Sequence, residues 1–284
     1  MLLVIVMYAL FGSVFTVGKY TLQFVDPYFL TGVRMLIAGG ILLPFCRQKK
    51  FKHFWLILGL GVFNVFITNA FEFWALQYMI SSKAALIYSL SPFFSILLSY
   101  LFYKEKMSAG KWVGLCIGLL GFIPLFLNPS AARALSLPDL AVAISAFTAV
   151  VGWLCMKQIM HKHGYSFLTA NMYSFFIGGV LSLLCSPFLD PWDPLPLHAW
   201  KPMLLGVLYI SIIHNVICYN IYGYCIRRFS VSFMMFAGFT NPLFAALWGK
   251  IFLKETVDWS FFVSLAVIIF GIYLYSRQEL KRPS

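Results

Sequence analysis

Short segments containing charged residues, glycine and proline divide the chain into long apolar runs. A helix that crosses a bilayer needs about 20 apolar residues, or about 17 at the short end. The runs long enough for one crossing each are residues 2–20, 28–45, 54–77, 83–103, 109–127, 138–158, 166–186, 202–226, 231–252 and 258–276. Charged residues make up 11% of the chain, whereas a soluble domain carries about 25%. The sequence therefore predicts an all-α membrane protein with ten transmembrane helices and excludes a soluble domain.

Basic residues are concentrated in alternate connections between these runs. If the N-terminus is cytoplasmic, fourteen Lys and Arg residues lie on the inner side and five on the outer side. Because cytoplasmic loops of membrane proteins are enriched in Lys and Arg, we expect both termini in the cytoplasm. The same rule accounts for the formal net charge of +12 without a nucleic-acid partner. The six cysteines lie singly, with no CxxC spacing, so they indicate neither a zinc site nor a redox pair. We expect no metal site and no bound cofactor.

The second half of the chain repeats part of the first half. The segments SPFFSILLSYLFYKEK and NPLFAALWGKIFLKET are similar and lie 150 residues apart. The recurring residues are Pro92 and Pro242, Glu105 and Glu255, and, at an offset of 138 residues near the start of each half, Lys19 and Lys157. We therefore expect one five-helix repeat in residues 1–130 and a second in residues 137–278.

A repeat of five helices has an odd number of crossings, so the second repeat is expected to be inverted relative to the first. Inverted repeats are the architecture of alternating-access carriers, whose substrate site lies near the midplane of the membrane between the repeats. The sequence also lacks HExxH, GxSxG and paired intramembrane aspartates. It therefore predicts a transporter with a small-molecule substrate, and not an enzyme.

The third apolar run carries a polar stripe. Asn64, Thr68 and Glu72 recur every four residues, with Asn69 beside them, and this spacing places them on one face of an α-helix. A charge at membrane depth costs about 2.5–3.5 kcal/mol on insertion scales, so it is normally buried against a partner or a watery cavity. Arg34 is expected at a similar depth. Three alternatives follow: a structural Arg34–Glu72 ion pair, a Glu72 that meets a cationic or ammonium-bearing substrate, and a protonatable Glu72 that couples transport to protons.

Other candidates lie in the matching parts of the two halves. The eighth run is the repeat partner of the third and carries His214 and Asn215, with Tyr219 on much the same face. His214 is either a hydrogen-bonding core residue or a substrate contact. The paired prolines Pro92 and Pro242 are expected to kink their helices and act as hinges. The candidate substrate-binding residues are Glu72, Asn69, Thr68, Asn64, Tyr88, Ser91, His214, Asn215, Tyr219, Asn241, Phe15 and Trp153.

Several segments resemble one family. They are FLTGVRMLIAGG, which contains Arg34, FEFWALQYMISSKAALIYSLSPFFSILLSYLFYKEK, its copy SFMMFAGFTNPLFAALWGKIFLKE, and the glycine-spaced GKWVGLCIGLLGF. Over nearly its whole length the chain is similar to the drug/metabolite transporter superfamily, EamA type. The resemblance implies ten helices in two inverted five-helix repeats, a central substrate cavity and no ATP-binding domain. A multi-pass location in a bacterial inner membrane is expected.

Within the superfamily the chain looks most like the S-adenosylmethionine carriers of intracellular bacteria. That resemblance implies that Glu72 balances the sulfonium or amino group, that aromatic side chains stack on adenine, and that S-adenosylhomocysteine is the exchange partner. The alternative is an exporter of aromatic or other amino acids and small metabolites. Gly114 and Gly118 form a GxxxG motif, which usually marks close helix packing. We expect a monomer or a weak homodimer.

Overall fold

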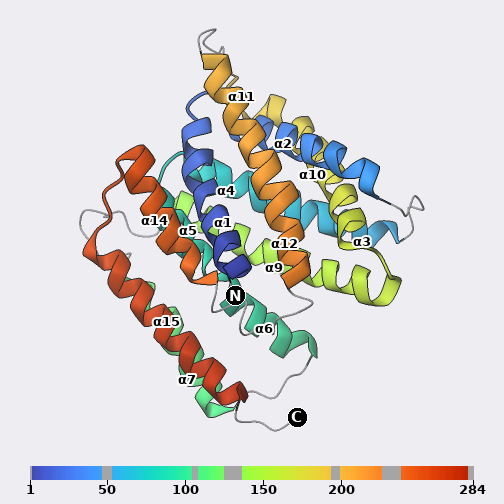
Figure 1. Ribbon diagram of the computed structural model, residues 1–284. Helices are drawn as coiled ribbons and strands as arrows, with labels where there is room; N and C mark the ends of the chain where they lie inside the picture. Colours follow the sequence, from blue (N-terminus) through green and yellow to red (C-terminus); the bar gives the residue numbers. More distant parts are fainter. Residues whose placement is uncertain are drawn as a thin grey trace.

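The computed structural model describes residues 2–46, 53–103, 108–124, 136–192, 199–225 and 238–280. All regular structure in these ranges is helical (Figure 1), which confirms the predicted all-α class. The helices of the first half are α1 (Leu2–Thr21), α2 (Pro27–Leu42), η1 (Leu43–Phe45), α3 (Phe54–Gly59), η2 (Leu60–Ile67), α4 (Thr68–Leu76), α5 (Ser81–Tyr88), α6 (Ser91–Tyr103) and α7 (Ala109–Leu120). Those of the second half are α9 (Leu137–His163), α10 (Phe167–Leu189), α11 (Trp200–Tyr209), η5 (Ile210–Cys218), α12 (Tyr219–Cys225), α14 (Thr240–Leu253) and α15 (Trp259–Leu280).

Seven helical segments in the described part of the chain are long and apolar enough to cross a membrane. They are Leu2–Thr21, Pro27–Phe45, Phe54–Leu76, Ser81–Leu98, Leu137–Met160, Phe167–Leu189 and Trp200–Cys225. The other three expected crossings fall on α7, α14 and α15, where the apolar helical stretch is shorter. Ten crossings, the inversion and the cytoplasmic termini therefore stay predictions. Most of the basic residues that support the orientation, and Glu105, lie outside the described residues.

Both repeat-related prolines lie in the first turn of a helix. A break at residues 89–90 separates α5 from α6, and Pro92 is the second residue of α6. Pro242 follows a turn at Phe239 and lies in the first turn of α14. Proline is tolerated in a first turn because those N–H groups have no partner within the helix. The structure thus differs from the expected mid-helix kinks, while the hinge role stays a prediction.

Two helical crossings contain a π-helical segment in the middle. These segments, η2 and η5, begin 150 residues apart, which is also the offset of the sequence repeat. In a π-helix the hydrogen bonds join residues five apart instead of four, and such segments are frequent at functional sites. Around η2, the side chains of Thr68 and Asn69 also donate to carbonyls five residues earlier, at 2.6 and 3.2 Å. The side chains that follow each segment are therefore rotated relative to a continuous α-helix.

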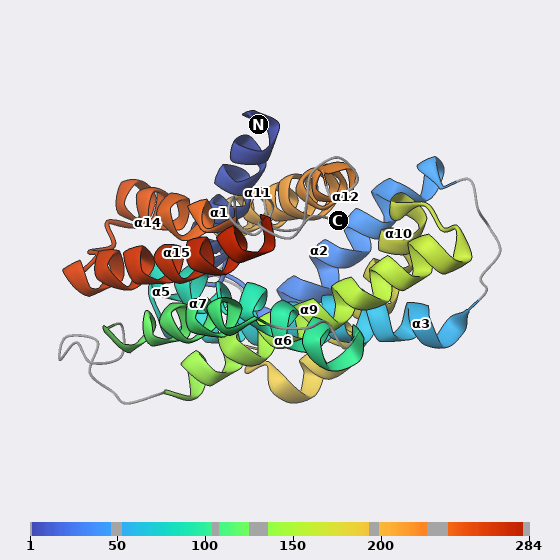
Figure 2. The same cartoon turned by 90° about the horizontal axis from the view of Figure 1, so that it is seen from below.

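Helices α7 and α15 pack side by side at one edge of the molecule (Figures 1 and 2). Gly271 of α15 lies directly against Gly118 of α7, and a Cβ at Gly271 would stand 2.7 Å from the carbonyl oxygen of Gly114. Small residues allow two membrane helices to approach this closely. The GxxxG motif is therefore used for a contact within the chain. The oligomeric state stays a prediction.

We expect Gly271→Ala to destabilise the protein, because the added methyl group would overlap backbone atoms that cannot move aside. Overpacking of this kind costs about 1–3 kcal/mol. The measurement is the thermal unfolding midpoint in detergent. Gly40→Ala is the matched control, since a Cβ at Gly40 meets no atom within 4 Å. Equal midpoints for the two variants would contradict the account of this crossing.

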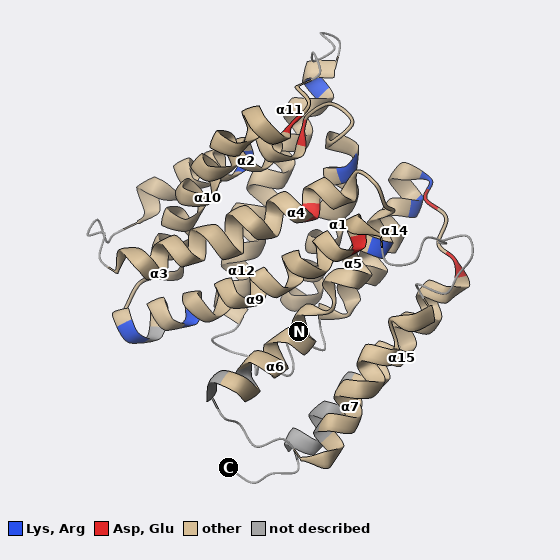
Figure 3. Ribbon diagram, turned by 180° about the vertical axis from the view of Figure 1, so that it is seen from behind, with Lys and Arg blue, Asp and Glu red and all other residues tan. Residues whose placement is uncertain are grey.

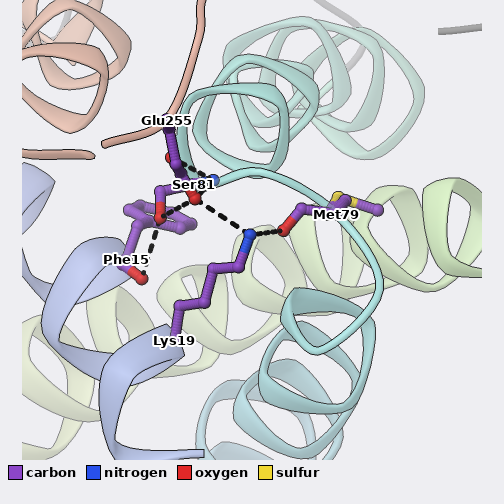
Figure 4. A network of polar contacts seen from close by, with 5 residues as sticks. All are labelled: Phe15, Lys19, Met79, Ser81 and Glu255. Carbon is purple, nitrogen blue, oxygen red and sulfur yellow. Dashed lines mark hydrogen bonds and ion pairs between the residues drawn. The ribbon is translucent and has the colours of Figure 1, made fainter. Parts of the chain in front are cut away.

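Most of the charged residues that the structure describes lie at helix ends and in connections (Figure 3). Glu255 connects the segment after α14 to the end of α1 and to the start of α5 (Figure 4). Its carboxylate is 2.9 Å from Nζ of Lys19 at the end of α1, and it accepts hydrogen bonds of 3.1 and 3.0 Å from the backbone N–H of Ser81 at the start of α5. Lys19 also donates to the carbonyl oxygen of Met79 at 2.7 Å. A second ion pair, Lys83–Asp139 at 2.8 Å, joins α5 to α9.

Candidate functional site

Arg34 of α2 is the most deeply buried charge in the described structure, with an exposed fraction of 0%. Its Nη1 donates to Oδ1 of Asn215 at 3.1 Å and lies 3.2 Å from Nδ1 of His214. Its Nη2 donates to Oδ1 of Asn69 at 2.6 Å, and the guanidinium carbon stands 4.2 Å from the ring centre of Phe73. All four contacts are with neutral groups. An arginine only donates hydrogen bonds, so Nδ1 of His214 must accept, and its ring is uncharged here.

Glu72 lies on α4 near this cluster and is buried, with an exposed fraction of 6%. It directly precedes Phe73, whose ring covers the Arg34 guanidinium. The ion pairs of the described residues are Lys19–Glu255 and Lys83–Asp139, and no hydrogen bond there engages the Glu72 carboxylate. The structural ion pair that the sequence left open is therefore not formed in this structure.

An aromatic wall extends from the Arg34 cluster. The His214 ring lies 5.3 Å from Tyr219 of α12, whose ring is 5.6 Å from Trp153 of α9. Trp153 in turn lies 4.8 Å from Tyr222, and both rings are partly exposed. On the other side, Phe11 of α1 meets His214 edge-on at 5.3 Å. Four helices thus present rings that can pack against a planar molecule.

Tyr88 adds a further aromatic group from α5. It is partly exposed at the end of that helix and packs against Phe15 of α1 with ring centres 6.3 Å apart. The structure therefore gathers candidates from both halves of the chain around two buried charges. These gathered candidates are Glu72, Asn69, Tyr88, Phe15, Trp153, His214, Asn215 and Tyr219, together with Arg34.

Two candidates of the polar stripe face α9 instead. The Thr68 hydroxyl lies 2.9 Å from that of Thr148, and Ser145 donates to the Thr68 carbonyl at 2.7 Å. Asn64 packs directly against Gly152, where a Cβ would collide with it. The expectation of one shared face assumed an α-helix, whereas residues Leu60–Ile67 are π-helical. Substrate contacts for Thr68 and Asn64 stay predictions.

The two candidates beside the prolines lie at helix starts. The Ser91 hydroxyl donates to the carbonyl of Tyr88 at 2.8 Å and so bridges the break between α5 and α6. Asn241 lies at the start of α14, and its side-chain oxygen has no partner among the described residues. Their roles in substrate binding also stay predictions.

Sequence reasoning did not single out Phe73 and Phe11. Phe73 covers the guanidinium of Arg34, and Phe11 contacts both His214 and Tyr219. The chain contains 30 phenylalanines, so a single one carries little information. For Phe73 a signal was present in its position beside Glu72, in the same helical turn as the polar stripe.

A separate titratable pair lies outside the membrane-spanning segments. The rings of His53 and His163 are stacked with centroids 3.6 Å apart. Burial lowers the pKa of His163, and the neighbouring His53 and Lys162 lower it further. Protonation of His163 is therefore disfavoured while the rings are stacked.

Comparison with known proteins places the chain among transporters. A family model described as the EamA-like transporter family matches residues 1–127 and 136–277. A protein of Chlamydia muridarum (strain MoPn / Nigg), named as an S-adenosylmethionine/S-adenosylhomocysteine transporter, is 29% identical over 96% of this chain and 90% of its own length. An inner membrane transporter of Escherichia coli (strain K12) is 27% identical over 98% of this chain and 90% of its own. A solved crystal structure with 17% sequence identity superimposes with a TM-score of 0.69 over 99% of this chain and 98% of its own, which shows a shared fold.

Proposed function

Since the chain belongs to the EamA-like transporter family and is a multi-pass inner membrane protein, we propose that it exchanges S-adenosylmethionine for S-adenosylhomocysteine. The name of the chlamydial relative supports this substrate. The observation that carries the proposal is the Glu72 carboxylate, which is buried and unpaired among the described residues beside an aromatic wall.

The charge of the substrate matches Glu72. Burying a carboxylate is costly unless an opposite charge or hydrogen bonds compensate it, and a cation that enters the site would provide both. S-adenosylmethionine carries a sulfonium and an ammonium group beside its carboxylate. S-adenosylhomocysteine lacks one methyl group and one positive charge but keeps the ammonium group, so one site can accept both molecules in turn.

The adenine ring of the substrate matches the aromatic wall. Trp153 is partly exposed, and the ring of Phe167 lies nearly parallel to it, inclined by 14° with the ring centres 6.2 Å apart. Base–aromatic stacking contributes about 1–3 kcal/mol per base. Tyr219 and Tyr222 flank Trp153 and extend the surface toward His214.

We expect Trp153→Ala to raise the concentration of S-adenosylmethionine needed for half-maximal exchange by roughly tenfold, because one stacking surface is lost. The measurement is uptake of labelled substrate into proteoliposomes over a concentration series. Trp200→Ala is the matched control, because Trp200 is exposed at the start of α11. An unchanged half-maximal concentration in Trp153→Ala would remove this residue from the site.

Alternating access requires the site to open toward one side at a time. At the end where α1 stops and α5 starts, Glu255 holds both helices to the segment that follows α14. This end cannot open between these elements while these bonds persist. We therefore assign the Glu255 network to the closure of this end, which is the expected outer end.

An exporter of aromatic or other amino acids is the second candidate. An amino acid also has an ammonium group for Glu72, and an aromatic side chain would fit the same wall. Competition separates the two functions. The test uses purified protein in liposomes preloaded with unlabelled S-adenosylmethionine, and follows uptake of the labelled compound. Saturable exchange that S-adenosylhomocysteine inhibits and phenylalanine does not would support the proposal. No uptake by protein shown to be folded would reject this substrate and favour the amino acids.

A further inference from the structure

Arg34 lacks an anionic partner in the described structure. Its Nη1 and Nη2 are held by Asn69, His214 and Asn215, which are all neutral, and its Nε–H has no hydrogen-bond partner there. A buried cation without a counter-charge costs several kcal/mol. The surrounding amides and imidazole hold the guanidinium in place, but they do not neutralise it.

Glu72 is in the complementary situation. It is a buried anion without a hydrogen bond or ion pair among the described residues, and in α4 it lies between Asn69 and Phe73, which both contact the Arg34 guanidinium. The two charges are neighbours, yet they do not meet at bonding distance. A zwitterionic molecule could compensate both residues at once, with its anionic group at Arg34 and its cationic group at Glu72. A simple cation would compensate only Glu72.

We propose that Arg34 and Glu72 together bind the α-amino acid group of the substrate, with its carboxylate at Arg34 and its ammonium group at Glu72. This inference rests on the proposed function and deepens it. It makes Arg34 a specificity-determining residue and defines the substrate class as solutes with an α-amino acid group. Both S-adenosylmethionine and the amino acids of the second candidate function belong to that class.

The orientation of Arg34 suits a carboxylate. The unpaired Nε–H and the neighbouring Nη2 group form one edge of the planar guanidinium, and such an edge binds a carboxylate through two parallel hydrogen bonds. Phe73 covers one face of the plane, so the carboxylate approaches along the edge. Because Arg34 is fully buried, this approach requires a neighbouring side chain to move, which links substrate binding to a rearrangement of the site.

The test compares two competitors that differ only in the carboxylate. Proteoliposomes exchange labelled S-adenosylmethionine, and we measure the concentrations of unlabelled S-adenosylmethionine and of its decarboxylated analogue that halve the exchange. The wild type is expected to need at least about tenfold more of the analogue, because a charge-assisted hydrogen-bonded contact is lost. In Arg34→Gln the ratio is expected to fall to about one. In Arg34→Lys, which keeps the charge but not the two-pronged edge, it is expected to lie between these values.

The ratio is measured within each variant and so does not depend on how much of the protein folds. Arg277→Gln, at an exposed position near the end of α15, is the matched control and should keep the wild-type ratio. Equal competition by both compounds in the wild type would overturn the inference and leave the exchange function standing.

A different result would reject the substrate without rejecting the inference. If S-adenosylmethionine is not exchanged, the same comparison is made with labelled phenylalanine and with phenethylamine, which lacks the carboxylate. A preference for phenylalanine that disappears in Arg34→Gln supports the inference under the second candidate function. Equal competition, or no exchange of either labelled solute, overturns it.

Discussion

Glu72→Gln is expected to reduce the exchange of S-adenosylmethionine by about thirtyfold or more. The substitution keeps the shape of the side chain but removes the negative charge that, among the described residues, the site offers to an ammonium group. Removal of one partner from a buried charge pair costs about 2–5 kcal/mol, and every 1.4 kcal/mol is about a factor of ten. The measurement is the initial rate of labelled uptake into preloaded proteoliposomes, at several substrate concentrations.

Asp258→Asn is the control for Glu72→Gln, because Asp258 is an exposed carboxylate just before α15. Competition by S-adenosylhomocysteine adds a second measurement. If Glu72 binds the ammonium group, which both compounds carry, the variant loses affinity for both to a similar degree. A loss confined to S-adenosylmethionine would place the sulfonium at Glu72 instead. Exchange at the wild-type rate would exclude Glu72 from the site.

Glu255→Gln is expected to lower the stability of the folded protein by about 2 kcal/mol, which is several degrees in the unfolding midpoint. The variant loses the charge that pairs with Lys19 and that caps the first turn of α5. We estimate less than for a fully buried pair, because the Lys19 side chain is 25% exposed. Thermal unfolding in detergent measures the change, with the exposed Lys250→Gln as control.

Exchange of the two charges separates the roles of Glu255. The double variant Lys19→Glu with Glu255→Lys restores opposite charges, but it places an ammonium group at the N-terminus of α5. That terminus carries N–H groups and a partial positive charge, and it therefore favours an anion. We expect the double variant to remain as unstable as Glu255→Gln. Full recovery of the unfolding midpoint would show that the contact is a simple ion pair and that the capping account is wrong.

The membrane class and the family could be predicted from the sequence because both depend on local features. Apolar run length alone places α1, α2 and α10 close to the expected crossings. Run length predicts one helix at 83–103 for the fourth crossing, whereas a turn at residues 89–90 interrupts the helix. Run length measures apolar character and does not report where backbone hydrogen bonding changes.

The polar stripe shows the same limit at the scale of one turn. A spacing of four residues predicted one shared face for Asn64, Thr68 and Glu72, but η2 joins residues five apart. Asn64 and Thr68 consequently pack against α9, while Asn69 reaches Arg34. Five of the eight residues of η2 are Val, Ile or Phe, and two are Leu and Gly. The same residue types make up much of α1, which is α-helical throughout, so composition does not identify the π-helical segment.

The site itself depends on contacts between distant parts of the chain. Each of Arg34, His214 and Asn215 was a candidate on its own, but the sequence gives no signal that they bond to one another. That contact results from the packing of α2 against η5. Similarly, Arg34 and Glu72 were expected at one depth, which does not determine whether their charged groups meet.

The neutral groups around Arg34 have a consequence for biosynthesis. Asn69 follows Arg34 by 35 residues, whereas His214 and Asn215 follow it by 180 and 181. When α2 enters the bilayer, His214 and Asn215, which will accept hydrogen bonds from Arg34, have not yet been translated. An exposed arginine at that depth costs about 2.5–3.5 kcal/mol on insertion scales. The cost of burying Arg34 in the first half is therefore not fully compensated until the eighth expected crossing is inserted. Because of this order of synthesis, the first half reaches its final stability only after the two halves have assembled.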